Sequence, residues 1–141
     1  MAEADYFPRV QEVVIPILRD ALGPGVTVSS WVNDIDYREY PIVNVRRLGG
    51  PRHTGMPEFM DSPVIELTVH HWEGLVEAEE LYTRALSALF EARRTQKVVD
   101  RGYLARVRET MGMTQFSSLF QDAFRVQGLI EVVVRPKREE P

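Results

Sequence analysis

Hydrophobic residues near the centre of the chain alternate with polar ones and then change to a helical spacing. Residues 63–72 alternate between an apolar and a polar face, which is typical of a β-strand. After Gly74, apolar residues recur at steps of three and four, with acidic residues at the start and basic residues at the end of the segment. The pattern predicts a helix of about 20 residues, roughly 30 Å long. Its expected apolar stripe is Leu75, Ala78, Leu81, Tyr82, Ala85, Leu86, Leu89 and Phe90.

The flanking segments supply a second helix and further strands. An apolar stripe from Val10 to Ala21, stopped by residues 23–25, predicts a helix with a kink rather than a break at Pro16. Alternating or short apolar segments predict the other strands, at 26–32, 42–48, 103–111 and 124–135. The order is α-β-β-β-α-β-β. This order predicts an α+β fold, a mostly antiparallel sheet of about five strands with two helices on one face.

Two segments are expected to be loops. Residues 50–62 have no period and are rich in Gly and Pro, which predicts a mobile loop between two strands. Hairpin loops of that length are unusual and often functional. Residues 112–122 form a second predicted loop, apolar for an exposed segment, which either folds over its own core or is ordered by a partner.

Composition indicates one soluble globular domain over residues 1–141, with a frayed end at 1–6 and a polar tail at 137–141. The chain is 44% hydrophobic and 27% charged, enough to bury a core. No apolar run approaches the roughly 18 residues of a membrane span. The N-terminus lacks the pattern of a secretory signal, so synthesis in the cytoplasm is expected. The absence of cysteine excludes disulfides, thiolate metal sites and a cysteine nucleophile.

Charge is distributed unevenly along the chain. The net charge is −4, but residues 1–92 carry −8 and residues 93–141 carry +4. This asymmetry either reflects chance plus one acidic helix start, or marks two complementary surfaces that meet between subunits. No dense Lys/Arg run with interleaved aromatic residues is present, which argues against tight nucleic-acid binding.

Candidate catalytic and metal-binding residues are few. His70 and His71 are adjacent in a predicted strand, so they point to opposite faces, cannot chelate one ion together, and are expected to be partly exposed at the strand end. A composite site of His53, Glu58 and one of this pair would suit a small metal-dependent hydrolase, although closed metal sites need several ligands at fixed spacing. No nucleophile elbow or phosphate-binding loop is present. The sequence therefore favours a protein without catalytic residues, metal or cofactor.

Arg46 and Arg47 are consecutive within a predicted strand, so they project from both faces of the sheet. One of them must point toward the helix-covered side near the end of the sheet. Either both side chains reach solvent from a strand terminus, or they make a charged contact with a neighbouring subunit.

Several short strings resemble a known family. Residues 41–50, the loop that follows, and residues 61–69 entering an Ala/Leu/Glu-rich helix resemble the lambda-like tail terminator proteins of long-tailed, non-contractile bacteriophages, especially those of actinobacterial phages. Residues 122–127 and the strand ending at Pro136 are similar to the C-terminal part of that family. The resemblance covers residues 7–136 and agrees with the element order. Neck proteins of the same phages share similar small folds, which leaves another head–tail connector protein as an alternative.

The resemblance implies a structural role. Tail terminators form a hexameric ring that caps the tail tube, stops its polymerisation and presents the surface that docks to the head connector. The implied partners are further copies of the chain, the tail tube protein and the connector, and the implied place is the head–tail junction of the virion, after assembly in the host cytoplasm. Double-stranded DNA would pass through the ring without specific binding, which suits an acidic subunit. The candidate interface residues are Arg46, Arg47, Gly49, Gly50, Arg52, His53, Phe116, Phe120 and Arg125.

Overall fold

The computed structural model describes residues 8–30, 39–117 and 123–137 of the chain. It contains two helices and five strands in the predicted order α-β-β-β-α-β-β. These elements are α1 (Val10–Leu22), β1 (Thr27–Ser29), β2 (Ile42–Arg47), β3 (Val64–His71), α2 (Leu75–Thr95), β4 (Gly102–Phe116) and β5 (Phe124–Pro136).

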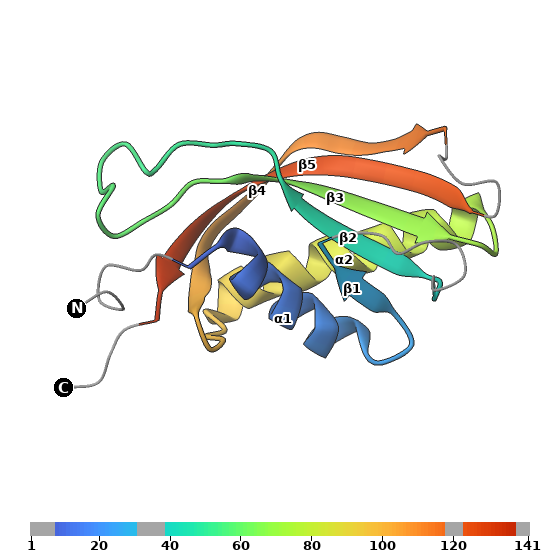
Figure 1. Cartoon of the computed structure of the whole chain (residues 1–141), viewed down its shortest axis with the longest axis horizontal. Helices are drawn as coiled ribbons and strands as arrows, with labels where there is room; N and C mark the ends of the chain where they lie inside the picture. The colour runs from blue at the N-terminus through green and yellow to red at the C-terminus, as the bar shows by residue number, and fades with distance from the viewer. Residues whose placement is uncertain (1–7, 31–38, 118–122, 138–141) are drawn as a thin grey trace.

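The strands form a single mixed sheet in the order β1-β2-β3-β5-β4. β1 pairs with β2 in parallel, and the other neighbouring strands are antiparallel. Both helices lie on one face of this sheet (Figure 1). α2 carries the chain from β3 to the edge strand β4, and β5 then returns between them. The predicted α+β fold, with its mostly antiparallel sheet, is confirmed.

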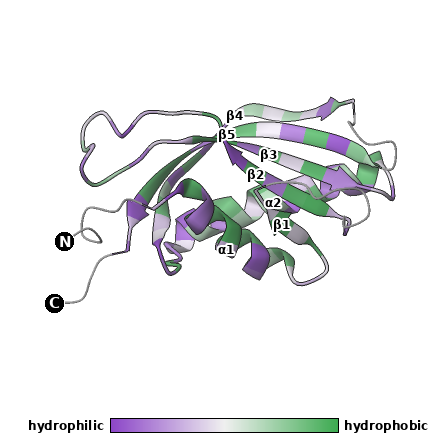
Figure 2. Ribbon diagram, viewed as in Figure 1, coloured by the Kyte–Doolittle hydropathy of each residue, from purple (hydrophilic) through white to green (hydrophobic). Residues whose placement is uncertain are grey.

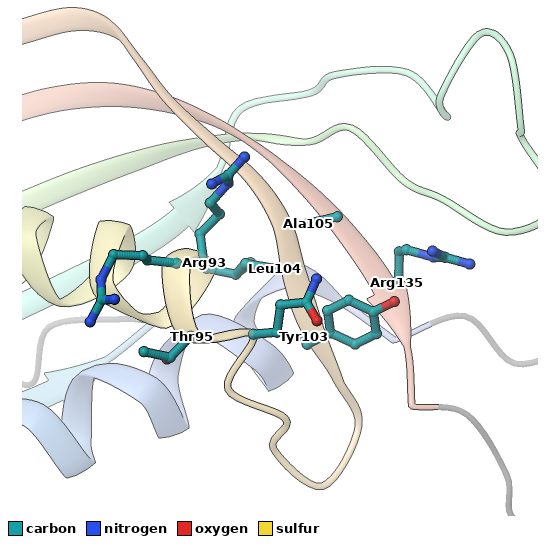
Figure 3. A pocket seen from close by; sticks show the side chains of 8 residues that line it. Arg93, Thr95, Tyr103, Leu104, Ala105 and Arg135 are labelled. Atoms are coloured by element: carbon teal, nitrogen blue, oxygen red, sulfur yellow. The ribbon is translucent and has the colours of Figure 1, made fainter.

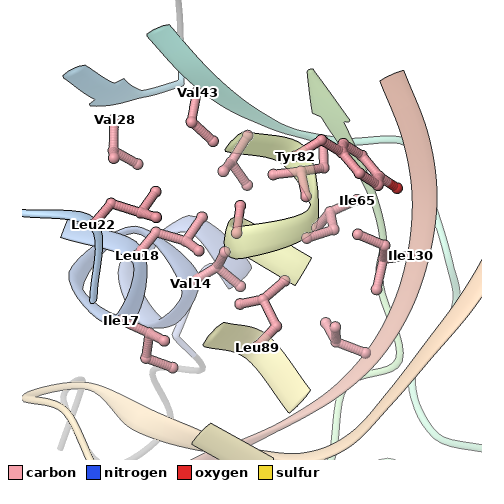
Figure 4. Close-up of a cluster of buried hydrophobic side chains, with 14 of the residues drawn as sticks. Val14, Ile17, Leu18, Leu22, Val28, Val43, Ile65, Tyr82, Leu89 and Ile130 are labelled. Atoms are coloured by element: carbon pink, nitrogen blue, oxygen red, sulfur yellow. The ribbon is translucent and has the colours of Figure 1, made fainter. Parts of the chain in front are cut away.

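The core lies between the two helices and the sheet. Along the strands, hydrophobic and hydrophilic residues form alternating bands (Figure 2), so one face of each strand meets the helices. Tyr82 and Leu89 of α2 are fully buried there with Leu18 of α1 and Ile65 and Ile130 of the sheet (Figure 4). Fully burying an aliphatic side chain of this size stabilises a fold by about 1.5–3 kcal/mol. α1 continues through Pro16, as predicted.

The end of β4 differs from the sequence-based prediction. The strand runs to Phe116 rather than Met111, so the first part of the predicted loop 112–122 is strand. Thr114, Gln115 and Phe116 are in register with Gln127, Val126 and Arg125 of β5, and this pairing extends the strand. Irregularities in the β4–β5 register interrupt the alternation, which is why a search for period two ends the strand early. Leu119 and Phe120 lie outside the described residues.

Two expectations about exposure are wrong. His70 and His71 are 5% and 7% exposed rather than partly exposed, because β3 is the central strand and both of its edges are paired. Phe90 is 43% exposed, so the buried stripe of α2 does not include it although Leu89 is fully buried. Periodicity predicts which side of a helix a residue lies on, but the surface against which the helix packs decides how much of that side is buried.

Candidate functional site

The segment between β2 and β3, residues 48–63, extends beyond the body of the protein (Figure 1). We name it the arm. At its root the β2–β3 hairpin continues through hydrogen bonds from Leu48 N to Val64 O (2.7 Å) and from Val64 N to Gly49 O (3.2 Å). Gly49 and Gly50 then turn the chain with positive φ values of 74° and 90°, a conformation that glycine adopts without steric cost.

The root of the arm is held by an ion pair between Arg47, the last residue of β2, and Asp61. The Arg47 guanidinium donates from Nη1 to Asp61 Oδ2 at 2.7 Å and from Nη2 to Oδ1 at 3.2 Å. It also donates to the carbonyl oxygens of Gly49 at 3.0 Å and Gly50 at 2.6 Å. Asp61 is only 4% exposed. One arginine therefore binds the outgoing and the returning halves of the arm together, in the bidentate geometry that arginine favours with carboxylates.

The backbone of the returning half is attached to β5. Asp61 N donates to Val134 O at 3.0 Å, and Val134 N donates to Asp61 O at 2.8 Å. The two halves of the arm also approach each other closely, because a Cβ atom on Gly50 would lie 2.4 Å from the carbonyl oxygen of Ser62. The root therefore has a fixed geometry set by the body of the protein.

The outer part of the arm has hydrogen bonds of its own. His53 Nδ1 accepts from the backbone N–H groups of Gly55 at 3.2 Å and Met56 at 3.1 Å, and Arg52 Nη1 donates to Pro57 O at 2.8 Å. Met56 and Phe59 remain 42% and 52% exposed. The segment predicted as a mobile loop thus has an internal hydrogen-bond network that presents two large apolar side chains to solvent.

Arg46 lies on the other face of β2 from Arg47. Arg47 shares its face with the core residues Val43 and Val45, as expected for alternate strand positions, whereas Arg46 pairs with Glu66 on the helix-free face. Its Nη2 lies 3.1 Å from Glu66 Oε2, and its side chain is 59% exposed. The prediction that the two arginines project from opposite faces is confirmed, and each makes an ion pair within its own chain.

The remaining candidates lie at the opposite end of the sheet. Phe116 and Arg125 are directly paired across β4 and β5, and the guanidinium carbon of Arg125 lies 5.1 Å from the centre of the Phe116 ring, a cation–π contact. Arg125 Nη2 also donates to Gln127 Oε1 at 3.0 Å. Phe120 lies outside the described residues. The structure therefore brings Arg47, Gly49, Gly50, Arg52 and His53 together at the arm, whereas this pair lies at the other end of β3.

A catalytic or metal-binding arrangement has little support from the geometry. His53 belongs to the arm and its Nδ1 accepts two backbone N–H groups, whereas His70 is buried within β3. His71 Nδ1 accepts from Glu73 N at 3.1 Å. Within the described ranges, no group of three or more histidine, aspartate or glutamate side chains is arranged to hold a metal ion.

Sequence reasoning missed three important residues of this site. The sequence pattern places Asp61 only in a string that flanks a strand, and Met56 and Phe59 only in a loop. The available signals were large apolar residues inside a Gly/Pro-rich hairpin loop, and an arginine and an aspartate at its two ends. Opposite charges at the two roots of a hairpin loop are placed to meet once the strands pair.

Comparisons with known proteins show the family to which the chain belongs. Residues 6–141 match the family described as phage tail termination protein. The chain is 50% identical over 132 residues to the Gene 22 protein of Mycobacterium phage D29, and equally to that of Mycobacterium phage L5, covering 93% of this chain and 95% of each relative. None of the described helices is long and apolar enough to cross a membrane. The resemblance noted in the sequence is thereby confirmed: the chain belongs to the phage tail termination protein family and is a structural protein of the bacteriophage tail.

Proposed function

We propose that the protein is the tail terminator of its phage, acting as a homohexameric ring at the head–tail junction. The ring closes on the finished tail tube, ends its polymerisation and presents the surface to which the head connector docks. Membership of the family over residues 6–141 supports this role. The role needs binding surfaces and no catalytic residue, metal or cofactor.

The arm is the structural observation that carries the proposal. It presents exposed Met56 and Phe59 on a hairpin whose root is fixed by Arg47 and Asp61. Large apolar side chains exposed on a projecting element are typical of contact sites, and a pre-ordered element loses less conformational entropy when it binds. The arm therefore contacts another protein of the tail, either the tube protein or an adjacent copy.

The charge of the subunit suits the passage of DNA through such a ring. A subunit with a net charge of −4 suits a lumen that repels phosphate on average, in which a duplex slides without being gripped. Basic residues at the root of the arm and in β5 are engaged in contacts within the chain, among them Arg47 with Asp61 and Arg125 with Phe116.

The first experiment measures the mass of the purified protein across a concentration series, with negative-stain images of the same samples. The expected particle is a ring of six copies around a hole of about 20 Å or more, wide enough for a DNA duplex. Particles of another closed size would correct the stoichiometry. A monomer at every concentration would contradict self-assembly of the free protein.

A second experiment tests termination itself. Tail tube protein is allowed to polymerise with and without this protein, and tube lengths are measured by electron microscopy. We expect shorter tubes with a ring at one end. An unchanged length distribution, together with binding to the head connector alone, would instead indicate a neck protein.

A further inference from the structure

The two ends of α2 carry opposite charge. Glu73, Glu77, Glu79 and Glu80 lie at its start, and Arg93 and Arg94 at its end. A helix of 21 residues separates these ends by about 30 Å. Within the described part of the chain, none of these four carboxylates forms an ion pair. The acidic end is therefore a concentration of negative charge that the described residues of its own subunit leave unpaired.

The basic end of α2 borders a concave pocket of about 310 Å³ between the helix terminus, β4 and β5. Arg93, Arg94 and Arg135 line it together with Tyr103, and among the described residues no carboxylate does. Tyr103 stands between the end of α2 and Arg135 (Figure 3), and the guanidinium carbon of Arg135 lies 5.9 Å from its ring centre. Arg94 is engaged by Glu91. Arg93 and Arg135 have no carboxylate partner in the described ranges, which leaves the pocket suited to incoming carboxylates.

Each end also exposes large apolar side chains. Trp72 and Val76 are 58% and 60% exposed beside the acidic cluster, and Phe90 and Val98 are 43% and 52% exposed near the basic pocket. Apolar side chains next to unpaired charge are the usual composition of a protein–protein contact, with an apolar centre and a polar rim. The two ends therefore match each other in charge and both offer apolar surface.

We propose that the two ends of α2 are the two halves of a head-to-tail contact between neighbouring copies of this chain. The carboxylates of Glu73 and Glu80 of one copy enter the pocket formed by Arg93, Arg135 and Tyr103 of the next. Trp72 packs at the edge of the same contact. This inference rests on the proposed ring and assigns the surfaces that build it.

The placement of opposite charges at the two ends of α2 favours a head-to-tail contact between copies. A rigid helix cannot bring its own two ends together, so the complementary surfaces meet only between copies. A head-to-tail contact uses one acidic and one basic end of every copy and repeats until it closes into a ring. The competing arrangement is an antiparallel pair of α2 helices, which satisfies both ends at once and stops at a dimer.

The test uses two charge-reversed variants. The basic-end variant carries Arg93→Glu and Arg135→Glu, and the acidic-end variant carries Glu73→Lys and Glu80→Lys. All four side chains lie at the surface or half-buried at it, so the fold is expected to persist, which circular dichroism checks. Arg84→Glu, an exposed charge reversal in the middle of α2, is the matched control. Assembly is measured by mass as a function of concentration.

Each variant alone is expected to assemble at least tenfold more weakly than the wild type, and the control like the wild type. An equimolar mixture of the two variants is expected to restore rings with alternating copies, because the reversed surfaces complement each other. The proposed contact is overturned if the mixture does not recover ring assembly, or if each variant alone assembles as tightly as the wild type. In both cases, rings formed by the wild type leave the proposed function intact. Recovery only to a dimer overturns the head-to-tail arrangement. Absence of wild-type assembly at all concentrations overturns self-assembly of the free protein through this contact.

A variant truncated after Lys137 tests whether the C-terminal tail of the chain, rather than a neighbouring copy, occupies the pocket. Residues 138–141 include Glu139 and Glu140, which are also carboxylates. We expect the shortened chain to assemble like the wild type. Loss of assembly as large as that of the basic-end variant would assign the pocket to the tail of the chain and overturn the proposal.

Discussion

Arg47 and Asp61 stand at the two roots of the arm and join them through two hydrogen bonds of 2.7 and 3.2 Å. The same guanidinium binds two carbonyl oxygens of the Gly49–Gly50 turn. A residue predicted as an inter-subunit contact is therefore first a structural clamp within its own chain. Its contact with another subunit remains a prediction. Because Arg47 also holds the root of the arm, its substitution tests the geometry of the arm as well as the interface.

The ion pair is expected to stabilise the fold measurably. A double-mutant cycle with Arg47→Ala and Asp61→Ala should give a coupling free energy of about 1–3 kcal/mol in urea unfolding, because Asp61 is buried and bonded bidentately. The cross-strand pair Arg46 and Glu66 is the control, since Arg46 is 59% exposed. Its coupling should be about 0.2–1 kcal/mol. Equal coupling free energies in the two pairs would show that the ion pair between Arg47 and Asp61 stabilises the fold no more than an exposed ion pair does.

Charge reversal at Arg47 tests whether the root of the arm takes part in assembly. Arg47→Glu places a second carboxylate against buried Asp61, so the root of the arm should open while the remaining core keeps the chain folded. We expect loss of rings, or of tube capping, with a native circular dichroism spectrum. Assembly at the wild-type level would remove the root of the arm from the interface.

The two glycines of the arm are expected to respond differently to alanine. Gly49→Ala incurs only the cost of a positive φ, about 1–2 kcal/mol, because a Cβ atom there meets nothing within 4 Å. Gly50→Ala adds a clash, since its Cβ would lie 2.4 Å from Ser62 O and 2.7 Å from Val64 N. Its cost should exceed that of Gly49→Ala by about 1–3 kcal/mol. Urea unfolding and protease cleavage of the arm measure the difference, and equal effects would contradict the close approach.

Stability should fall at high pH because of one buried tyrosine. Tyr82 is 1% exposed and donates to Glu109 Oε2 at 3.1 Å. Burial, followed by the hydrogen bond and the negative charge of Glu109, raises the pKa of Tyr82 well above its usual value of 10.0. Since the folded state holds the proton that the unfolded state releases, its contribution is complete below pH 10 and is lost as pH rises above it.

The variant Tyr82→Phe isolates this contribution. Between about pH 8 and about pH 11, the wild type should lose about 1.4 kcal/mol more of its unfolding free energy than the variant. Urea unfolding at both pH values measures this difference. Parallel losses in the two proteins would show that Tyr82 ionises equally in the folded and unfolded states.

The tip of the arm is expected to matter for assembly and not for folding. Met56→Ser with Phe59→Ser removes apolar surface that is already exposed, so the unfolding free energy should change by less than about 0.5 kcal/mol. Tube capping should be lost. Met113→Ser, at a 39% exposed position of β4, is the matched control and should cap normally. Rings that form but fail to cap would assign the tip to the tube protein, whereas loss of both would assign it to the neighbouring copy.

The amino-acid sequence by itself determined the elements and their order. Both helices, the strands of the sheet and the opposite directions of Arg46 and Arg47 follow from spacings of two, three and four residues, which are local properties of the backbone. The family followed as well, because its strings are contiguous stretches such as residues 41–50. The long hairpin loop was recognisable from its glycines and prolines.

Tertiary structure alone decided how these elements meet. The clamp between Arg47 and Asp61 joins residues that no local period connects. His70 and His71 are buried because β3 became the central strand, and the strand order depends on where β5 inserts. β4 reaches Phe116 because β5 supplies its hydrogen-bond partners. In each case the deciding interaction is with a segment distant in sequence, and the spacing of residues within one segment does not show it.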